Sequence, residues 1–245
     1  MAVNVNTVYQ TVLFLLNKEQ RGYMTPAEFN SVARQVQLEI FEKYFDDLNQ
    51  YLRVPRLSTE LADRVKVVEE RISEFETTAV LQATYVLPAD LHRFGTIQYQ
   101  PNGGRMIECE ETTQHEYYLA QRSKLTQPST THPIFTRRGD TLQVYPSLPV
   151  ADLHCYYVRK PVDPIWAFTI GSQGQYVWVD PDGALPPGLI YPTPPGTSVH
   201  FEISDQDQTE LVLEILLYAG IIIRDPSIVQ AASSQIQQEE VTEKK

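Results

Sequence analysis

Cysteine is scarce in this sequence. Its 245 residues include two cysteines, Cys109 and Cys155, and neither has a second cysteine or a histidine at metal-ligand spacing. Disulfide-rich secreted domains and zinc modules carry clustered cysteines. The pattern here favours two reduced, half-buried thiols in a cytosolic protein. The sequence therefore predicts neither a disulfide framework nor a metal site.

Long apolar runs are also missing. A membrane-spanning helix needs roughly 18 to 20 continuous apolar residues, and the longest candidates, residues 12–16 and 211–223, are too short or interrupted by charge. The N-terminal sequence MAVNVNTVYQ lacks the basic segment that begins a signal peptide. With 42% apolar residues the chain can still build a core. We therefore expect a soluble protein that stays where it is synthesised and has no membrane partner.

Positive charge is in short supply. The chain has 20 lysines and arginines against 31 aspartates and glutamates, which gives a net charge of −11. A protein that grips DNA phosphates along an extended face usually shows the opposite balance. An acidic surface instead keeps a subunit soluble or complements a basic partner. It also suits the wall of a tube through which DNA slides without being held.

Catalytic motifs are absent from the sequence as well. It has no phosphate-binding loop and no Gly-x-Ser-x-Gly nucleophile motif, and its five histidines are too widely spaced to share a metal. Asp180 and Asp182 are the best candidates for a glycosidase carboxylate pair. The flanking Pro181 and Gly183 favour a β-turn there instead. We therefore predict a protein that is not an enzyme, with no catalytic, cofactor-binding or metal-binding residues.

Helical patterns occupy the first third of the chain. Apolar residues recur at helical spacing over residues 5–16, and the pattern stops near Asn17. A strong start signal follows, in which Thr25 can cap a helix, Pro26 suits its first position and Glu28 completes a capping box. The sequence therefore predicts a second helix that begins at this signal.

A third helix is expected shortly afterwards. The second helix should end before Pro55, and Ser58 or Thr59 can cap the next one, which carries apolar residues along one side. Three helices joined by short turns predict a compact antiparallel bundle.

The middle of the chain carries β patterns. Its short β-branched and aromatic runs predict strands at residues 84–87, 96–99, 106–109, 134–137, 142–145 and 153–158. Hairpin signals lie at residues 101–104 and at Gly139-Asp140. Thr112 or Thr113 is expected to cap a brief helix between them. These segments predict an antiparallel sheet of four to six short strands.

Residues 161–198 form an insertion that is rich in proline, glycine and aromatic residues. Within it, residues 167–170 and 176–179 are predicted to pair as strands across a loop. Long loops of this composition are often interaction elements, and a surface hairpin followed by a linker accounts for the composition equally well.

The C-terminal part returns to helical patterns. Residues 199–203 predict a final strand, after which Ser204 or Asp205 is expected to cap a helix. The second half of this helix, LLYAGIII, is apolar nearly all round, which predicts burial between layers or in a subunit interface. Asp225-Pro226 should break it and begin another helix, and the final QQEEVTEKK is expected to fray.

The predicted fold class is α+β. N- and C-terminal segments form an antiparallel helical bundle, and a small antiparallel β-sheet domain is inserted between them. The predicted divisions are the N-terminal helices in residues 1–80, the β-rich domain in 81–160, the insertion in 161–198, the final strand and C-terminal helices in 199–238, and a polar tail in 239–245.

Three stretches of the sequence occur in a familiar order. The first is RGYMTPAEFN at residues 21–30, which leads into a helix ending EKYFDDLNQYL. The second begins with YVLPADL at residues 85–91 and continues with PIF, LQVYP and a strand ending YVRKP. The third is the closing helix pair at residues 210–230, with YAGI and Asp225-Pro226. Together these stretches resemble the head-to-tail connector proteins, the adaptor and ring proteins, of short-tailed, crAss-like and related tailed phages.

The resemblance implies a structural virion protein. Such a protein is a subunit of a closed homo-oligomeric ring, here expected to be a dodecamer, that joins head to tail and lines the DNA channel. Its expected partners are the portal protein, other tail ring proteins, and genomic DNA that passes without specific binding. It would be assembled in the cytoplasm of the host bacterium and would then reside in the connector or tail of the virion.

The expected assembly interface combines the C-terminal helices with the aromatic insertion. A ring needs surfaces that must be buried between subunits, and the apolar helices and the exposed aromatics suit that need. The candidate interface residues are Leu216, Leu217, Ile221, Ile222, Ile223, Ile228, Val229, Trp166, Tyr176 and Trp178.

An alternative is a carbohydrate-binding or hydrolytic tail component. In that case Trp166, Tyr176 and Trp178 would form a platform on which a sugar ring stacks. Asp180 and Asp182 would lie beside the platform.

Overall fold

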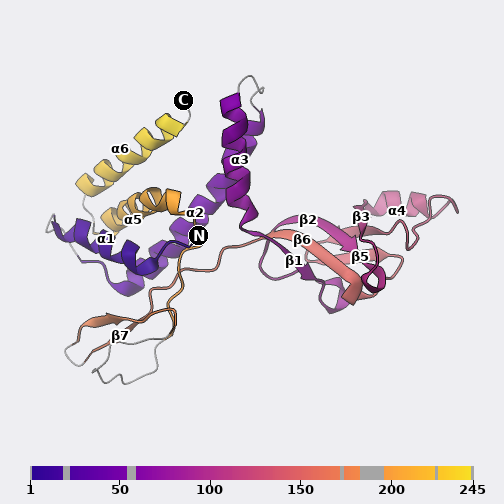
Figure 1. The fold of residues 1–245 in the computed structure, drawn as a ribbon, viewed down its shortest axis with the longest axis horizontal. Coiled ribbons are helices and arrows are strands. Elements are labelled where there is room, and N and C mark those ends of the chain that lie inside the picture. The colour runs from indigo at the N-terminus through magenta and orange to yellow at the C-terminus, as the bar shows by residue number, and fades with distance from the viewer. Residues whose placement is uncertain are drawn as a thin grey trace. The chain divides into compact units, whose positions relative to one another are not determined.

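The computed structural model describes residues 2–18, 23–53, 59–171, 174–182, 196–223 and 226–243. In these residues the fold is mixed α and β, with six α-helices, a curled mixed sheet of six strands and a small sheet of two strands. The predicted α+β class is thereby confirmed. The chain divides into two compact units, residues 1–68 with 161–245 and residues 69–160. We call them the helical unit and the β unit, and Figure 1 labels their elements.

The first two helices form where the sequence predicts them. α1 (Val5–Lys18) buries the apolar stripe on one of its faces. α2 (Pro26–Arg53) begins with the predicted capping box. The Thr25 backbone N–H donates to Glu28 Oε2 at 2.8 Å, and the Glu28 backbone N–H donates to Thr25 Oγ1 at 3.4 Å.

α3 (Thr59–Ser73) also matches its prediction, although a cap at Ser58 would lie outside the described residues. Its buried side chains, Val65, Val68 and Ile72, recur at helical spacing. The helix crosses the boundary between the two units of the chain.

The helical unit contains helices from both the N-terminal and the C-terminal parts of the chain. α5 (Gln208–Ile223) packs against α1, α2 and α6 (Pro226–Glu243) (Figure 1). A 3-10 turn at Asp205–Asp207 precedes α5, so this helix begins later than a cap at Ser204 or Asp205 predicts. The side chain of Ser204 makes no capping hydrogen bond to this turn.

The end of the chain differs from its prediction. α6 continues to Glu243, so the predicted polar tail at residues 239–245 is helical as far as that residue rather than frayed. The expected break at Asp225 lies outside the described residues. Among the described residues, no helix combines the length and the apolar character that a membrane crossing demands.

The large sheet belongs to the β unit and has the strand order β1-β6-β2-β3-β4-β5. Its strands are β1 (Glu76–Val80), β2 (Leu91–Tyr99), β3 (Ile107–Glu111), β4 (Ile134–Arg138), β5 (Thr141–Tyr145) and β6 (Leu153–Arg159). The hairpin across Gly139-Asp140 is confirmed, with Arg138 paired to Thr141. β3 and β4 are parallel, which corrects the prediction of a purely antiparallel sheet. The physical reason is the long crossover between them, which contains α4 (Gln114–Ala120) and reverses the chain twice.

The segment after β1 also differs from its prediction. Residues 84–87 were expected to form a strand, but Thr84 and Tyr85 have φ angles of 65° and 57°, which extended backbone does not allow. They form a tight 3-10 turn, after which Val86 bridges to Thr141 of β5. The sheet therefore curls until the segment that follows its first strand meets its last strand.

An apolar core fills the curl of the β unit. The buried residues of this core come from strands β2 to β6 and from the connecting segments. They are Leu81, Leu87, Ile97, Tyr99, Cys109, Phe135, Leu142, Val144, Leu148, Leu153, Cys155 and Tyr157. The side chains of β6 alternate between the two faces of the sheet, because Cys155 and Tyr157 are buried while Tyr156 faces outward.

The insertion contributes a second, small sheet to the helical unit. β7 (Phe168–Ile170) and β8 (Tyr176–Trp178) pair in antiparallel fashion, as predicted. The final strand predicted at residues 199–203 does not form. Val199 bridges to Ile165 and Phe201 bridges to Val3, so the segment pairs with two different partners and builds no continuous ladder.

Candidate functional site

Trp166 is the anchor of the insertion. Its indole Nε1–H donates to Asn6 Oδ1 of α1 at 3.0 Å. Asn30 of α2 accepts from the Trp166 backbone N–H at 2.8 Å and donates to the Trp166 carbonyl oxygen at 3.2 Å. Trp166 is only 4% exposed, and its ring centroid lies 4.5 Å from that of Tyr9. The structure thus buries Trp166 within the helical unit of this chain.

Beside Trp166 lies an aromatic cavity of about 720 Å³ between α1 and the small sheet. The predicted residues Trp166, Tyr176 and Trp178 all line it. The described residues that line it are Asn6, Tyr9, Gln10, Leu13, Tyr23, Trp166, Gly174, Gln175, Tyr176, Val177 and Trp178. The volume falls in the range of small-molecule sites. Sequence reasoning missed the contribution of Tyr9 and Tyr23, because nothing in the helical pattern links them to an insertion more than a hundred residues away.

One polar atom in this lining lacks a partner. The indole Nε1 of Trp178 is buried and makes no hydrogen bond with any of the described residues. A buried N–H without an acceptor costs about 1 to 3 kcal/mol.

The ionisable groups in and near the aromatic cavity include Tyr9, Tyr23, Tyr176 and two nearby aspartates. Burial, reinforced by a hydrogen bond with Tyr23, raises the pKa of Tyr9, whose hydroxyl donates to the Met24 carbonyl at 3.2 Å. Tyr9 is therefore neutral at ordinary pH. Asp180 and Asp182 follow β8 but do not line the cavity, so its described lining holds no acid–base pair.

The remaining candidate interface residues lie on α5 and α6. Leu216 is buried within the helical unit, whereas Leu217 and Val229 are half-buried. The side chains of Ile221, Ile222, Ile223 and Ile228 lie outside the described residues. Part of the apolar surface of α5 is therefore covered by this chain itself.

Polar contacts tie α5 to α2. The Tyr44 hydroxyl donates to Asp207 Oδ2 at 2.6 Å, and both residues are buried. Nearby, Lys43 forms an ion pair with Glu210. These contacts fix the start of α5 against the middle of α2.

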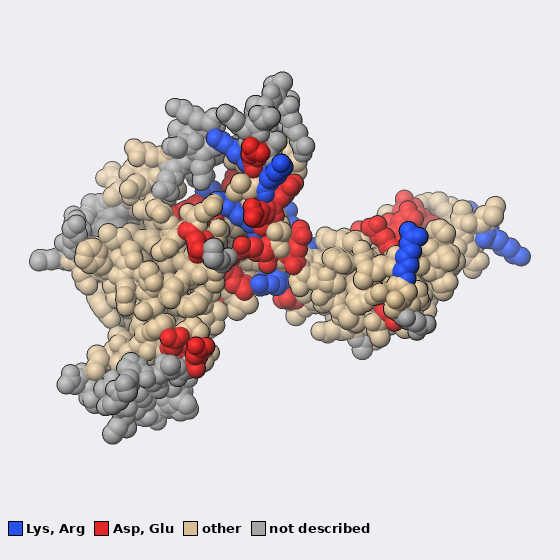
Figure 2. Space-filling view, in the orientation of Figure 1, with Lys and Arg blue, Asp and Glu red and all other residues tan. Residues whose placement is uncertain are grey.

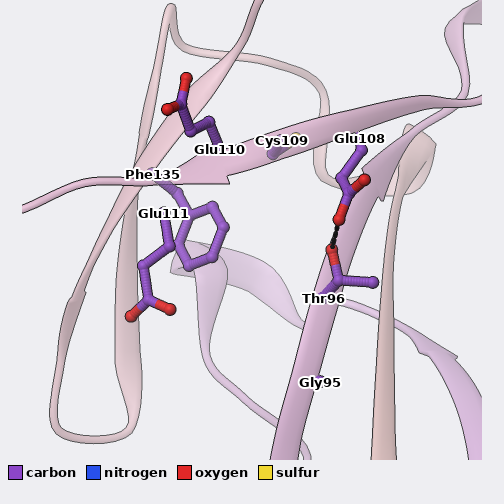
Figure 3. Close-up of a pocket in the computed structure, with 7 residues that line it drawn as sticks. All are labelled: Gly95, Thr96, Glu108, Cys109, Glu110, Glu111 and Phe135. Carbon is purple, nitrogen blue, oxygen red and sulfur yellow. Dashed lines mark hydrogen bonds between the residues drawn. The ribbon is translucent and has the colours of Figure 1, made fainter.

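A second hollow, of about 370 Å³, lies on the β unit and is lined by carboxylates. Figure 3 shows Glu108 turned toward Thr96, whose hydroxyl donates to Glu108 Oε1 at 2.9 Å. The carboxylates of Glu110 and Glu111 point to opposite sides of β3 (Figure 3). Because these three carboxylates point in different directions, they cannot coordinate one cation together. The described residues contain no cluster of three or more ligand-type side chains that could hold a metal ion.

The two thiols of the β unit are poor nucleophiles. Burial, with a smaller effect of Glu108, raises the pKa of Cys109 to about 11, and burial raises that of Cys155 to about 11. Both thiols are therefore protonated near neutral pH. Cys109 and Cys155 lie opposite Ile97 on the two strands that flank β2. Two strand spacings, roughly 10 Å, separate them, which is too far for a disulfide.

The outer end of α4 carries exposed apolar side chains. The helix begins with a capping box in which the Thr113 backbone N–H donates to Glu116 Oε2 at 2.8 Å. Tyr117 turns inward and stacks on Tyr145, with ring centroids 3.8 Å apart. Tyr118 and the residues that follow are left outside.

We call this outer surface the α4 tip. Its apolar members, Tyr118, Leu119 and Leu125, are 57%, 46% and 97% exposed. Arg122 and Lys124 lie between them in sequence and are also exposed. Figure 2 shows basic side chains at the end of the β unit that α4 occupies in Figure 1. Sequence reasoning missed this surface, because the pattern YYLA fits a buried helix face equally well.

No protein-family model matches the sequence, and no curated protein matches it either.

Proposed function

We propose that the chain is a structural subunit of a ring in the head-to-tail connector of a short-tailed phage. The observation that carries the proposal is the order of the three connector-like stretches along the sequence. Each stretch belongs to a defined structural piece: the capped start of α2, the β4–β5 hairpin with the strand that follows it, and the α5–α6 pair. The expected dodecamer, the portal and tail partners and the place in the virion are parts of this proposal.

The architecture is compatible with assembly into a ring. A closed ring requires two different surfaces on each subunit, so that one copy can follow the next by rotation. The two units supply such surfaces, because the aromatic cavity lies on one and the α4 tip on the other. The antiparallel bundle that we expect from the N- and C-terminal helices would give the ring its rigid part.

The arrangement of potential reactive groups supports a protein that is not an enzyme. Three carboxylates diverge from the hollow on the β unit, and burial keeps both thiols protonated. The net charge of −11 suits a channel wall that lets DNA pass without binding its phosphates.

The test is direct imaging of the assembled state. Full-length protein is purified, and its mass is measured over a range of concentrations by mass photometry and electron microscopy, with and without portal protein. We expect closed rings whose mass corresponds to twelve subunits. A chain that remains monomeric at all concentrations and binds neither portal nor tail proteins would refute the proposal.

A carbohydrate-binding role is the second candidate, and the aromatic cavity is the observation that favours it. Aromatic faces with a few amide groups are suited to hold a sugar ring. The geometry differs from the expected platform, because Trp166 is buried and Asp180 and Asp182 lie outside the lining. Glycan-array binding that disappears in Trp178→Ala would support this role, and an array without any binding would exclude it.

A further inference from the structure

The α4 tip is built as a defined surface rather than a loose loop. The Thr126 hydroxyl donates to the Ala120 carbonyl at 2.9 Å, and the Arg122 backbone N–H donates to the Leu119 carbonyl at 3.1 Å. These bonds fold the residues after α4 back onto the end of the helix. Leu125 is thereby held outward with 97% of its surface exposed. Exposed apolar side chains that are gathered and rimmed by charge mark interaction surfaces.

The charge of the α4 tip is opposite to that of the chain as a whole. Arg122 and Lys124 flank Leu125, and no acidic side chain pairs with either of them in the part of the chain that the structure describes. On a chain with a net charge of −11, two unpaired cations beside an apolar group are suited to an acidic partner surface.

The aromatic cavity on the helical unit has the matching character. Five of the eleven described residues that line it are aromatic, and its volume of about 720 Å³ is larger than a leucine or tyrosine side chain requires. Asp180 and Asp182 follow the β8 strand that forms one wall. Figure 2 shows acidic side chains beside the small sheet.

We propose that the α4 tip of one copy of this chain inserts into the aromatic cavity of another copy. Tyr118, Leu119 and Leu125 would pack on the aromatic walls, and Arg122 and Lys124 would face Asp180 and Asp182. Each copy offers one tip and one cavity, so the contact is heterologous and can repeat around a closed ring. The inference rests on the proposed ring and names the contact that builds it.

The first test uses disulfide trapping between two full-length variants, Leu125→Cys and Tyr176→Cys. The native Cys109 and Cys155 are buried with pKa values near 11, so mild oxidation spares them. We expect a disulfide-linked heterodimer when the two variants are mixed, and none when either is oxidised alone. Leu52→Cys, at another exposed leucine, replaces Leu125→Cys as the matched control and should not link to Tyr176→Cys.

The second test exchanges the charges. Arg122→Glu/Lys124→Glu gives the tip the same charge as Asp180 and Asp182, which follow the β8 wall, and Asp180→Lys/Asp182→Lys gives these two positions the same charge as the tip. Each variant alone should self-associate at least tenfold more weakly than the unchanged chain, because like charges then face each other. A one-to-one mixture restores complementary contacts at every interface. We expect the mixture to assemble as well as the unchanged chain, in rings that alternate the two variants.

The possible failures separate this inference from the proposed function. Rings that form without any link between positions 125 and 176, and that tolerate both charge variants, would overturn the tip-in-cavity contact but leave the connector ring standing. Leu125→Cys chains that link to each other would indicate a tip-to-tip contact instead. Glycan binding that is lost in Trp178→Ala while rings persist would assign the cavity to a sugar. A chain that never associates would refute both proposals.

Discussion

The two units of this protein are held together by different means. The helical unit is assembled from segments far apart in the sequence, and polar side chains join them. Gln37 of α2 is buried, donates to the Val162 carbonyl at 2.7 Å and accepts from the Glu202 backbone N–H at 3.0 Å. Asn30 holds Trp166 in the same manner. The β unit is one continuous stretch of chain, closed by strand ladders around an apolar core.

This difference determines how each unit responds to damage. Removing a buried polar group leaves its partners without hydrogen bonds, which costs about 1 to 3 kcal/mol for each. Removing a large apolar side chain from a closed core leaves a cavity, which costs about 3 to 5 kcal/mol. Removing a whole segment should destroy the helical unit, whose parts depend on one another, and spare the β unit.

The largest expected effect follows from cutting the chain. A fragment of residues 69–160 should fold alone, because all its strand partners lie within it. A fragment of residues 1–68 should not, since α5 covers α1 and α2. Circular dichroism and thermal melting measure both outcomes. A cooperative melt of residues 1–68 alone would show that the helices need no C-terminal partner.

The next largest effect is expected in the apolar core of the β unit. Phe135 is fully buried, and its ring centroid lies 5.7 Å from that of Phe94. Phe135→Ala should lower the free energy of unfolding by about 3 to 5 kcal/mol. The control Phe14→Ala removes a ring that is mostly exposed on α1 and should change stability little. Denaturant titration compares the two, and equal losses would contradict the assigned core.

A smaller loss is expected from a polar joint of the helical unit. Gln37→Ala leaves the Val162 carbonyl and the Glu202 amide without their partner, so the free energy of unfolding should fall by about 1 to 3 kcal/mol. Gln35→Ala on the same helix removes an exposed amide that donates to Glu39 Oε1 and should be nearly neutral. Denaturant titration of the two variants tests the comparison. A neutral Gln37→Ala would mean that water replaces the amide.

The smallest effects belong to the two capping boxes. Hydrogen bonds from the side chain and backbone of Thr25 lower the pKa of Glu28, and those from the backbone and side chain of Thr113 lower the pKa of Glu116. A carboxylate whose pKa falls on folding stabilises the fold above its ordinary value of 4.5, and this contribution is lost as the pH drops through the lowered folded value.

Thr25→Ala and Thr113→Ala should each cost about 1 kcal/mol at pH 7. As the pH falls through the lowered pKa of the folded state, each variant should differ less from the unchanged chain, because Glu28 or Glu116 then becomes protonated in both proteins. Stability measured at a series of pH values from 7 downward checks this trend. A difference that does not shrink at lower pH would assign the effect to helix propensity alone.

Local signals predicted local structure well. The capping box at Thr25 and the turn at Gly139-Asp140 depend only on residues a few positions apart, and both form as expected. β1 was missed because its sequence, ETTAV, follows a helix without a turn signal, and its strand conformation is imposed by β6. Thr84 and Tyr85 are typical strand residues held at positive φ by the closure of the sheet.

The candidate site was predicted only in part. The aromatic residues Tyr176 and Trp178 were found because they stand in a loop-rich insertion, where large side chains are conspicuous. That Trp166 is buried follows from Asn30, a residue of α2 that carries no sequence signal for this contact. Distant pairs of this kind are fixed by packing, which periodicity does not encode.

One hydrogen bond in the β unit has an evolutionary consequence. The Arg159 backbone N–H donates to the Phe75 carbonyl at 2.9 Å, so the chain enters and leaves this unit on neighbouring strands. The two connections are roughly 5 Å apart, the distance that a tight hairpin spans. A gene that lost or exchanged this stretch would leave the course of the remaining chain almost unchanged. We expect homologues to differ most in what they carry between positions 75 and 159, with the flanking helices kept in common.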